Sequence, residues 1–198
     1  MPGQAIRLDP AIASQAAFRA VMDAMSHPGE VRTFATTVRA PAPLNPAAAA
    51  VACALMDFET PVWLDGPLAA APEFVTWLRF ETGAPVVAAA DAATFAVIAD
   101  PLAMPSFSAF ALGSHDYPDR SVTLLVQVER FGEGEPMRLS GPGLARPRGF
   151  SATPLPADFI ARLHVNRALF PRGVDIILAS DDAVAALPRS VRVKRESD

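Results

Sequence analysis

Histidine, serine and aspartate are the residue types in this chain that could do catalytic or metal chemistry. His27, His115 and His164 lie far apart, and none has the H-x₃-H or H-E-x-x-H spacing by which a helix presents two zinc ligands. A zinc site would need distant carboxylates to converge on one of them. We therefore expect no metal site and interpret the three histidines as polar surface or turn residues.

The run Gly113-Ser114-His115-Asp116 places the three residue types of a catalytic triad side by side. A triad needs these side chains in one chain of hydrogen bonds, whereas consecutive side chains point in different directions. The sequence also has no G-x-S-x-G elbow, the sharp turn that presents a nucleophilic serine. We predict a surface turn here and, because Cys53 lies in an alanine-rich segment, a buried cysteine. No catalytic residue is predicted.

The lysine content argues against two classes of cofactor site. Lys194, four residues from the end, is the only lysine of the sequence. A P-loop needs a lysine in its glycine-rich loop, and pyridoxal phosphate needs one for a Schiff base. The glycine pairs at 132–134 and 141–143 are explained by turn chemistry alone. We therefore expect no cofactor.

Arginines near the carboxyl terminus remain as candidates for binding. Arg167, Arg172 and Asp175 flank a predicted helix break and a buried strand. An arginine–aspartate pair could brace this loop, or a guanidinium could bind a phosphate or a partner, and both alternatives stay open. A basic tail follows, which we interpret as a solvated face with partner binding as the alternative; it consists of Arg189, Arg192, Lys194 and Arg195.

Composition excludes further classes. The formal net charge of −4 argues against binding nucleic acid by bulk charge. A single cysteine fits a reducing compartment and excludes a disulfide scaffold. Residues 1–7 have no signal-peptide pattern, and the longest apolar run, 47–56, is about half the length of a membrane span. We expect a soluble, cytoplasmic protein that contacts neither nucleic acid nor membrane.

The elements that must position these residues alternate between helix and strand over most of the chain. Apolar spacing and cap residues predict helices over 12–25, 46–56, 72–82, from Pro156 to about 169, and 181–187. Short apolar runs predict strands over 31–34, 62–64, 86–89, 95–98, 122–128, 137–139, 174–178 and 190–193. The strand at 137–139 is expected to form a hairpin with 122–128, and 100–120 a functional loop or a surface insertion. This pattern predicts an α/β fold with helices on both faces of a mixed sheet.

Several strings, in order over nearly the whole chain, carry a family resemblance. They are residues 18–29, 60–64, 78–80 with 82–85, 93–97, 139–143, 170–178 and 186–189. Together they resemble the PhnH family, the H subunit of the bacterial carbon–phosphorus lyase system. The chain departs from the family pattern at Ser190-Val191, where two threonines are expected.

The resemblance implies a single PhnH-like domain over residues 1–198. It implies a three-layer α/β/α fold with a mixed, mostly parallel sheet, similar to the large domain of pyridoxal-phosphate-dependent transferases without their cofactor. It also implies a core complex with the PhnG, PhnI and PhnJ subunits, and a homodimer when the chain is isolated. The low share of charged residues, 19%, independently favours an apolar interface between chains.

For function, the resemblance implies a subunit needed for organophosphonate catabolism. The family, with the G, I and L proteins, supports transfer of ribose triphosphate from ATP to methylphosphonate, giving α-D-ribose 1-methylphosphonate 5-triphosphate. The subunit's own role is expected to be structural or regulatory. The alternative is a stand-alone enzyme acting on nucleotides or phosphonates, in which Asp116, Arg120 and Asp175 would position a phosphorylated substrate.

Overall fold

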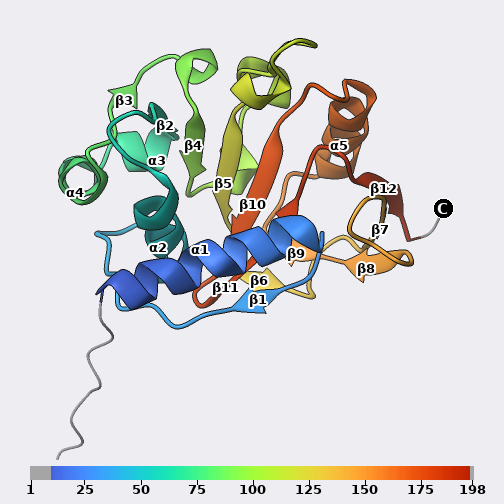
Figure 1. The fold of residues 1–198 in the computed structure, drawn as a ribbon, viewed down its shortest axis with the longest axis horizontal. Helices are drawn as coiled ribbons and strands as arrows, with labels where there is room; N and C mark the ends of the chain where they lie inside the picture. Colours follow the sequence, from blue (N-terminus) through green and yellow to red (C-terminus); the bar gives the residue numbers. More distant parts are fainter. Residues whose placement is uncertain (1–9, 197–198) are drawn as a thin grey trace, which may run out of the picture.

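The computed structural model describes residues 10–196 and has a seven-stranded sheet through its middle (Figure 1). Residues 1–7, where the sequence has no signal-peptide pattern, lie outside the described residues. The strands are β1 (Arg32–Thr33), β2 (Val62–Leu64), β3 (Val86–Val87), β4 (Phe95–Ile98), β5 (Thr123–Gln127), β10 (Asp175–Ala179) and β11 (Ala183–Leu187). Their order is β1-β11-β10-β5-β4-β2-β3, parallel from β10 to β3 and antiparallel at β11 and β1. The predicted α/β fold with a mixed, mostly parallel sheet is confirmed.

Helices cover one face of this sheet. They are α1 (Pro10–Ser26), α2 (Pro46–Leu55), the short α3 (Gly66–Ala69) and α4 (Pro72–Thr82). Two local signals are confirmed: Asn45 accepts a hydrogen bond from the Ala48 N–H at the start of α2, and Gly83 ends α4 in a left-handed conformation. Helices α1 and α2 bury alanine-rich faces, and α3 and α4 bury larger apolar side chains. All of them belong to one cluster with Val97, Leu125 and Ile177 of the central strands.

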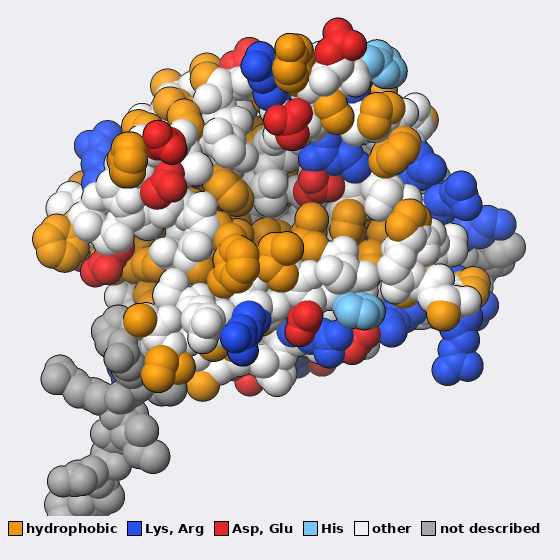
Figure 2. Space-filling model, viewed as in Figure 1, with side chains coloured by type: hydrophobic (Ala, Val, Ile, Leu, Met, Phe, Trp, Pro, Cys, Tyr) orange, Lys and Arg blue, Asp and Glu red, His pale blue; other side chains and the backbone are white. Residues whose placement is uncertain are grey.

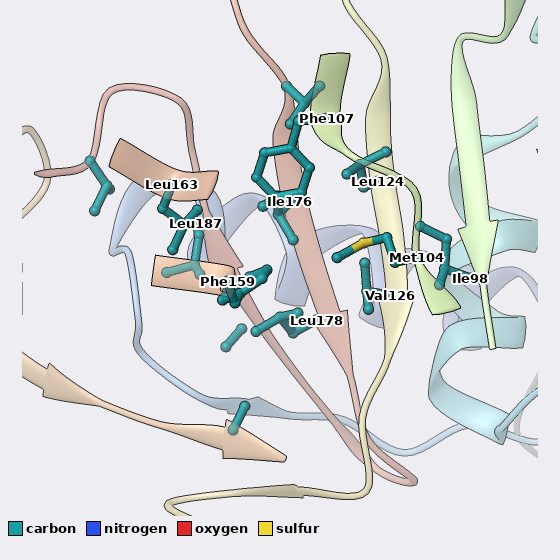
Figure 3. Packing of buried hydrophobic residues seen from close by; sticks show 14 of the residues in the cluster. Ile98, Met104, Phe107, Leu124, Val126, Phe159, Leu163, Ile176, Leu178 and Leu187 are labelled. Carbon is teal, nitrogen blue, oxygen red and sulfur yellow. The ribbon is translucent and has the colours of Figure 1, made fainter. Parts of the chain in front are cut away.

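The opposite face is covered by one helix, two 3₁₀ turns and a second sheet. These are α5 (Phe159–Ala168), the turns at Pro101–Ala103 and Phe107–Ala109, and a three-stranded sheet of β12 (Arg192–Arg195), β7 (Met137–Ser140) and β8 (Arg148–Phe150). Further 3₁₀ turns are formed by Ala90–Ala92 and Pro118–Arg120. A small ladder joins β6 (Arg130–Phe131) to β9 (Ala152–Thr153). Figure 3 shows Phe107 beside Leu124 and Ile176 of the central strands, and Phe159 beside Leu178. Much of the 100–120 segment thus covers the hydrophobic core, since Met104, Phe107 and Phe110 are buried.

The predicted hairpin between 122–128 and 137–139 is wrong. Strand β5 lies between β4 and β10, whereas β7 pairs with β8 and β12 in the small sheet. The burial patterns explain the separation. Residues Leu124 to Val126 are all buried, as suits a strand covered on both faces, whereas β7 alternates buried and exposed residues, as suits a sheet with one solvent face.

The predicted helix over 181–187 is also wrong. Residues Ala183–Leu187 form β11, joined to β10 by a tight turn in which the Ser180 N–H donates to the Ala183 carbonyl. All five residues of β11 are buried, and the Gly29 N–H donates to the Ala186 carbonyl. Pairing on both edges and burial on both faces outweigh the helix propensity of alanine.

Within residues 10–196, no helix is long and apolar enough to span a membrane.

Candidate functional site

The carboxyl edge of the parallel strands is where open α/β sheets usually bind ligands, at the point where the strand order reverses. Here the chain passes from β2 out to β3 and back to β4, so this point lies between β2 and β4. Asp65, directly after β2, occupies it. Its Oδ2 accepts hydrogen bonds from the N–H groups of Ala99 and Asp100, each at 2.8 Å, and its Oδ1 accepts from Leu68 N–H at 3.3 Å.

Asp65 therefore takes the backbone donors that would otherwise be available to an anionic ligand. Its side chain is buried, and this burial raises the pKa of Asp65 although the three backbone donors act in the opposite direction. The Asp65 carboxylate therefore links the ends of β2 and β4, and we call this arrangement the Asp65 clamp.

Further along the same edge, Gln127 and Asn45 hold the loop that leads into α2. Gln127 Oε1 accepts from the Asn45 N–H at 2.6 Å, and Gln127 Nε2 donates to the Pro43 carbonyl at 3.1 Å. Asn45 Nδ2 in turn donates to the Ala179 carbonyl at the end of β10, at 2.9 Å. These polar side chains serve the fold, so the carboxyl edge is fastened by the chain's own hydrogen bonds.

The amino edge carries the arginine–aspartate pair, but its members differ from those expected. Asp175, at the start of β10, binds Arg189, which follows β11. Asp175 Oδ1 accepts from Arg189 N–H at 2.8 Å and from Nε at 3.1 Å, and Asp175 Oδ2 accepts from Nη2. Arg189 Nη1 also donates to the Pro118 carbonyl, which ties the 118–120 turn to the sheet. The bracing alternative thus holds for Asp175, with Arg189 as the partner.

The interpretation of Arg189 as part of a solvated tail is wrong, since both side chains of the pair are only 15% exposed. The helix prediction for 181–187 does not bring Arg189 close to Asp175, and the pair is therefore not predicted. A β-hairpin over the same residues places Leu187 opposite Ile176, and therefore Arg189 beside Asp175.

Arg167 and Arg172 lie at this edge without joining that pair. The Arg167 guanidinium lies 4.7 Å from the centre of the Phe170 ring. The Nε atoms of Arg167 and Arg172 are buried and have no hydrogen-bond partner among the described residues. Of the residues considered for a stand-alone enzyme, Asp175 is held by Arg189 and Arg120 stacks on Tyr117 at 4.1 Å.

Comparison with known proteins places the chain in a family. The family model for "Bacterial phosphonate metabolism protein (PhnH)" matches residues 7–194. The chain belongs to the PhnH family. It is 41% identical over 190 residues to the α-D-ribose 1-methylphosphonate 5-triphosphate synthase subunit PhnH of Rhizobium meliloti (strain 1021), covering 95% of this chain and 94% of that protein. It is also 37% identical over 82 residues to the putative C-P lyase subunit protein HtxG of Stutzerimonas stutzeri, covering 41% of this chain and 42% of that one.

In this PhnH-family chain the predicted surface turn at 113–116 is confirmed. Ser114, His115 and Asp116 are exposed, and Ser114 Oγ accepts a hydrogen bond from the Tyr117 N–H. Two other histidines bind backbone carbonyls: His27 Nδ1 is 3.0 Å from Asp23 O, and His164 Nε2 is 2.7 Å from Val193 O. The described residues contain no cluster of three or more metal-ligating side chains.

Lys194 lies on β12, where its side chain is exposed. Pyridoxal phosphate needs a lysine inside a pocket that also binds its phosphate. The described residues of the PhnH-family chain do not fit this cofactor, because their lysine lies on an outer strand.

Proposed function

We propose that this chain is a non-catalytic subunit of the carbon–phosphorus lyase core complex, needed for organophosphonate catabolism. Its 41% identity over 95% of its length to a named synthase subunit carries the proposal. The complex would transfer ribose triphosphate from ATP to methylphosphonate, giving α-D-ribose 1-methylphosphonate 5-triphosphate. The transferase step, and the lyase step that later breaks the C–P bond, would belong to other subunits.

A structural or regulatory role is supported by what the polar groups of the sheet edges do. Asp65, Asn45 and Gln127 fasten loops and helix starts at the carboxyl edge, and Asp175 is held by Arg189 at the amino edge. These groups already have internal partners. Arg167 and Arg172, each with a buried and unpartnered Nε, remain candidates for an anion or an interface.

The partners that we propose are the PhnG, PhnI and PhnJ subunits, with a homodimer when the chain is isolated. Large apolar side chains on the surface support protein contacts: Phe58 is 73% exposed and Phe80 85% exposed. We propose a cytoplasmic location, in keeping with the single cysteine.

For the fold, we propose a single domain over residues 1–198 with three layers, similar to the large domain of pyridoxal-phosphate-dependent transferases. Support comes from the two hydrophobic clusters, which pack on opposite faces of one shared sheet.

Co-expression with PhnG, PhnI and PhnJ tests the assignment. We expect this chain to co-purify with an affinity-tagged partner, and failure to co-purify with any of them would overturn the proposal.

The purified chain, incubated alone with ATP and methylphosphonate, is expected to release no adenine. Release of adenine would instead indicate a stand-alone enzyme. Light scattering at micromolar concentration tests the homodimer, and a mass that stays near 20.9 kDa as concentration rises would reject it.

A further inference from the structure

The small sheet presents a row of cations on its outer face. Arg138 of β7 and Arg192 and Lys194 of β12 are all exposed, and we call these three residues the cationic face. Lys194 lies directly opposite Arg138 in the antiparallel register, and Arg192 lies two residues before Lys194. Because alternate residues of a strand share one side, the three side chains project from the same side of the sheet. Figure 2 shows Lys and Arg side chains gathered at the end of the molecule where Figure 1 places β7, β8 and β12.

The inner side of the same strands fixes this arrangement. Leu139 pairs with Val193, and both are buried against the core together with Met137. A one-residue slip of β12 would expose Val193 and bury a charge, so the register is strongly specified. His164 of α5 also lies within hydrogen-bond distance of the Val193 carbonyl, which fastens the outer edge of β12 to that helix. The cationic face is therefore held in place by packed elements.

The like charges of the cationic face lower the stability of the isolated chain. Like charges directly opposite each other on two strands repel, here Arg138 and Lys194. The acidic group paired with Arg138 is Glu196, 3.9 Å away, and both side chains are about half exposed, so solvent screens the contact. Among the described residues, Arg192 and Lys194 have no ion pair. An acidic surface placed on this face would relieve the repulsion.

The shape of the face indicates what kind of anion fits. Gly149 of β8 lies opposite Arg138, and a Cβ atom at Gly149 would have no atom within 4 Å. The surface at Gly149, beside Arg138, is therefore open and carries no side chain. Small ligands bind in concave sites that enclose most of their surface, whereas an open sheet face matches a broad partner.

We propose that Arg138, Arg192 and Lys194 form a docking surface for an acidic face of a partner subunit. The inference rests on the proposed function, because it assigns a location and a charge to the contact by which the chain joins its complex. Charge complementarity of this kind steers two proteins toward each other and fixes their relative orientation. Because salt screens exposed charges, binding through this face should weaken as salt is added.

Charge reversal tests the docking surface. Lys194→Glu places an acid opposite Arg138, so the isolated variant should melt at a temperature equal to or above that of the wild type. The same variant, and Arg138→Glu/Arg192→Glu/Lys194→Glu, should bind co-expressed PhnG–PhnI–PhnJ roughly tenfold or more weakly than wild type. Arg19 is exposed on α1, and Arg19→Glu makes the same charge change as Lys194→Glu at another surface, so this variant should bind as the wild type does. If the reversal variants do not fold, Arg192→Gln and Lys194→Gln carry the same test.

The outcomes separate the two proposals. Wild-type chain that fails to bind the three subunits overturns the proposed function and this surface with it. Wild type that binds, with reversal variants that bind equally well and with the same salt dependence, overturns the docking surface alone. Equal weakening by Arg19→Glu also overturns it, because bulk charge would then account for the effect.

Calorimetric titration with inorganic triphosphate tests the cationic face as a small-anion site. If the wild type binds triphosphate, the reversal variants do not, and their affinity for the partner subunits is unchanged, a small-anion site replaces the docking surface.

Discussion

Asp175 and Arg189 form a charged pair that the fold has largely removed from water. The carboxylate accepts hydrogen bonds from both the backbone and the guanidinium of Arg189, and each side chain is only 15% exposed. Removing one partner leaves the other charge without its counter-ion in a poorly solvated position. Asp175→Ala should therefore lower the free energy of unfolding by about 3 kcal/mol in urea denaturation.

The control for this pair is an exposed one. Arg130 and Glu133 lie 3.3 Å apart with side chains more than half exposed, so Arg130→Ala should change stability by less than about 0.5 kcal/mol. Equal effects at Asp175 and Arg130 would contradict the bracing role of Asp175.

Cys53 is predicted to be an unreactive thiol. It lines a groove of about 400 Å³ with Trp77 and Glu81, where burial and the Glu81 carboxylate raise the pKa of Cys53 to about 11. A raised pKa leaves about 0.1% thiolate at pH 8, so alkylation by iodoacetamide should be far slower than for a small thiol and should rise steeply above pH 9. Glu81→Gln should lower the pKa of Cys53 and speed alkylation at pH 8. A rate that is flat between about pH 8 and pH 10 would contradict this prediction.

At the scale of elements, Gly143 controls how the loop between β7 and β8 meets the end of α1. Its φ is +80°, and a Cβ there would collide with the Ser26 carbonyl oxygen and lie 2.9 Å from Pro28 Cδ. Gly143→Ala should therefore lower the free energy of unfolding by at least about 2 kcal/mol, because alanine is strained at this positive φ and its Cβ collides with Ser26.

Gly149 provides the matched comparison, since a Cβ there meets nothing within 4 Å. Gly149→Ala should leave the free energy of unfolding within about 0.5 kcal/mol of that of the wild type. If the two glycine variants unfold at the same urea concentration, the predicted strain and collision at Gly143 are contradicted.

How far the sequence predicts an element depends on whether its signal is local. The start of α2 and the end of α4 follow from Asn45 and Gly83, which act on adjacent backbone groups. Strand β11 has alanine-rich local signals that favour helix, and only burial and pairing with β1 and β10 make it a strand. The Asp175–Arg189 pair depends on that hairpin, and the helix prediction for 181–187 therefore does not place the two residues together. In the Asp65 clamp, the hydrogen bond from Ala99 to Asp65 likewise joins strand ends 34 residues apart in the sequence, and no local sequence pattern predicts it.

For the whole molecule, the sheet predicts a graded resistance to opening. Strands β5 and β10 lie in its middle with cores on both faces, whereas β3 is a two-residue edge strand and only half-buried. Amides of β5 and β10 should exchange with deuterium only on global unfolding, and those of β3 through local opening that is orders of magnitude more frequent. Hydrogen-exchange mass spectrometry measures this directly, and similar exchange rates in β5 and β3 would contradict it.

The pairing of β1 with β11 has a consequence for the order of synthesis. Arg32 pairs with Val184, so a strand made early finds its neighbour about 150 residues later. At the usual speed of translation, the emerging amino-terminal segment waits roughly 10 to 30 s for that neighbour. During this time the face of α1 that finally packs on β11 has no strand to cover it, because β11 leaves the ribosome late. A nascent chain stalled before residue 183 would thus present an alanine-rich apolar surface, and we expect chaperones that bind hydrophobic segments to hold it until the last hairpin emerges.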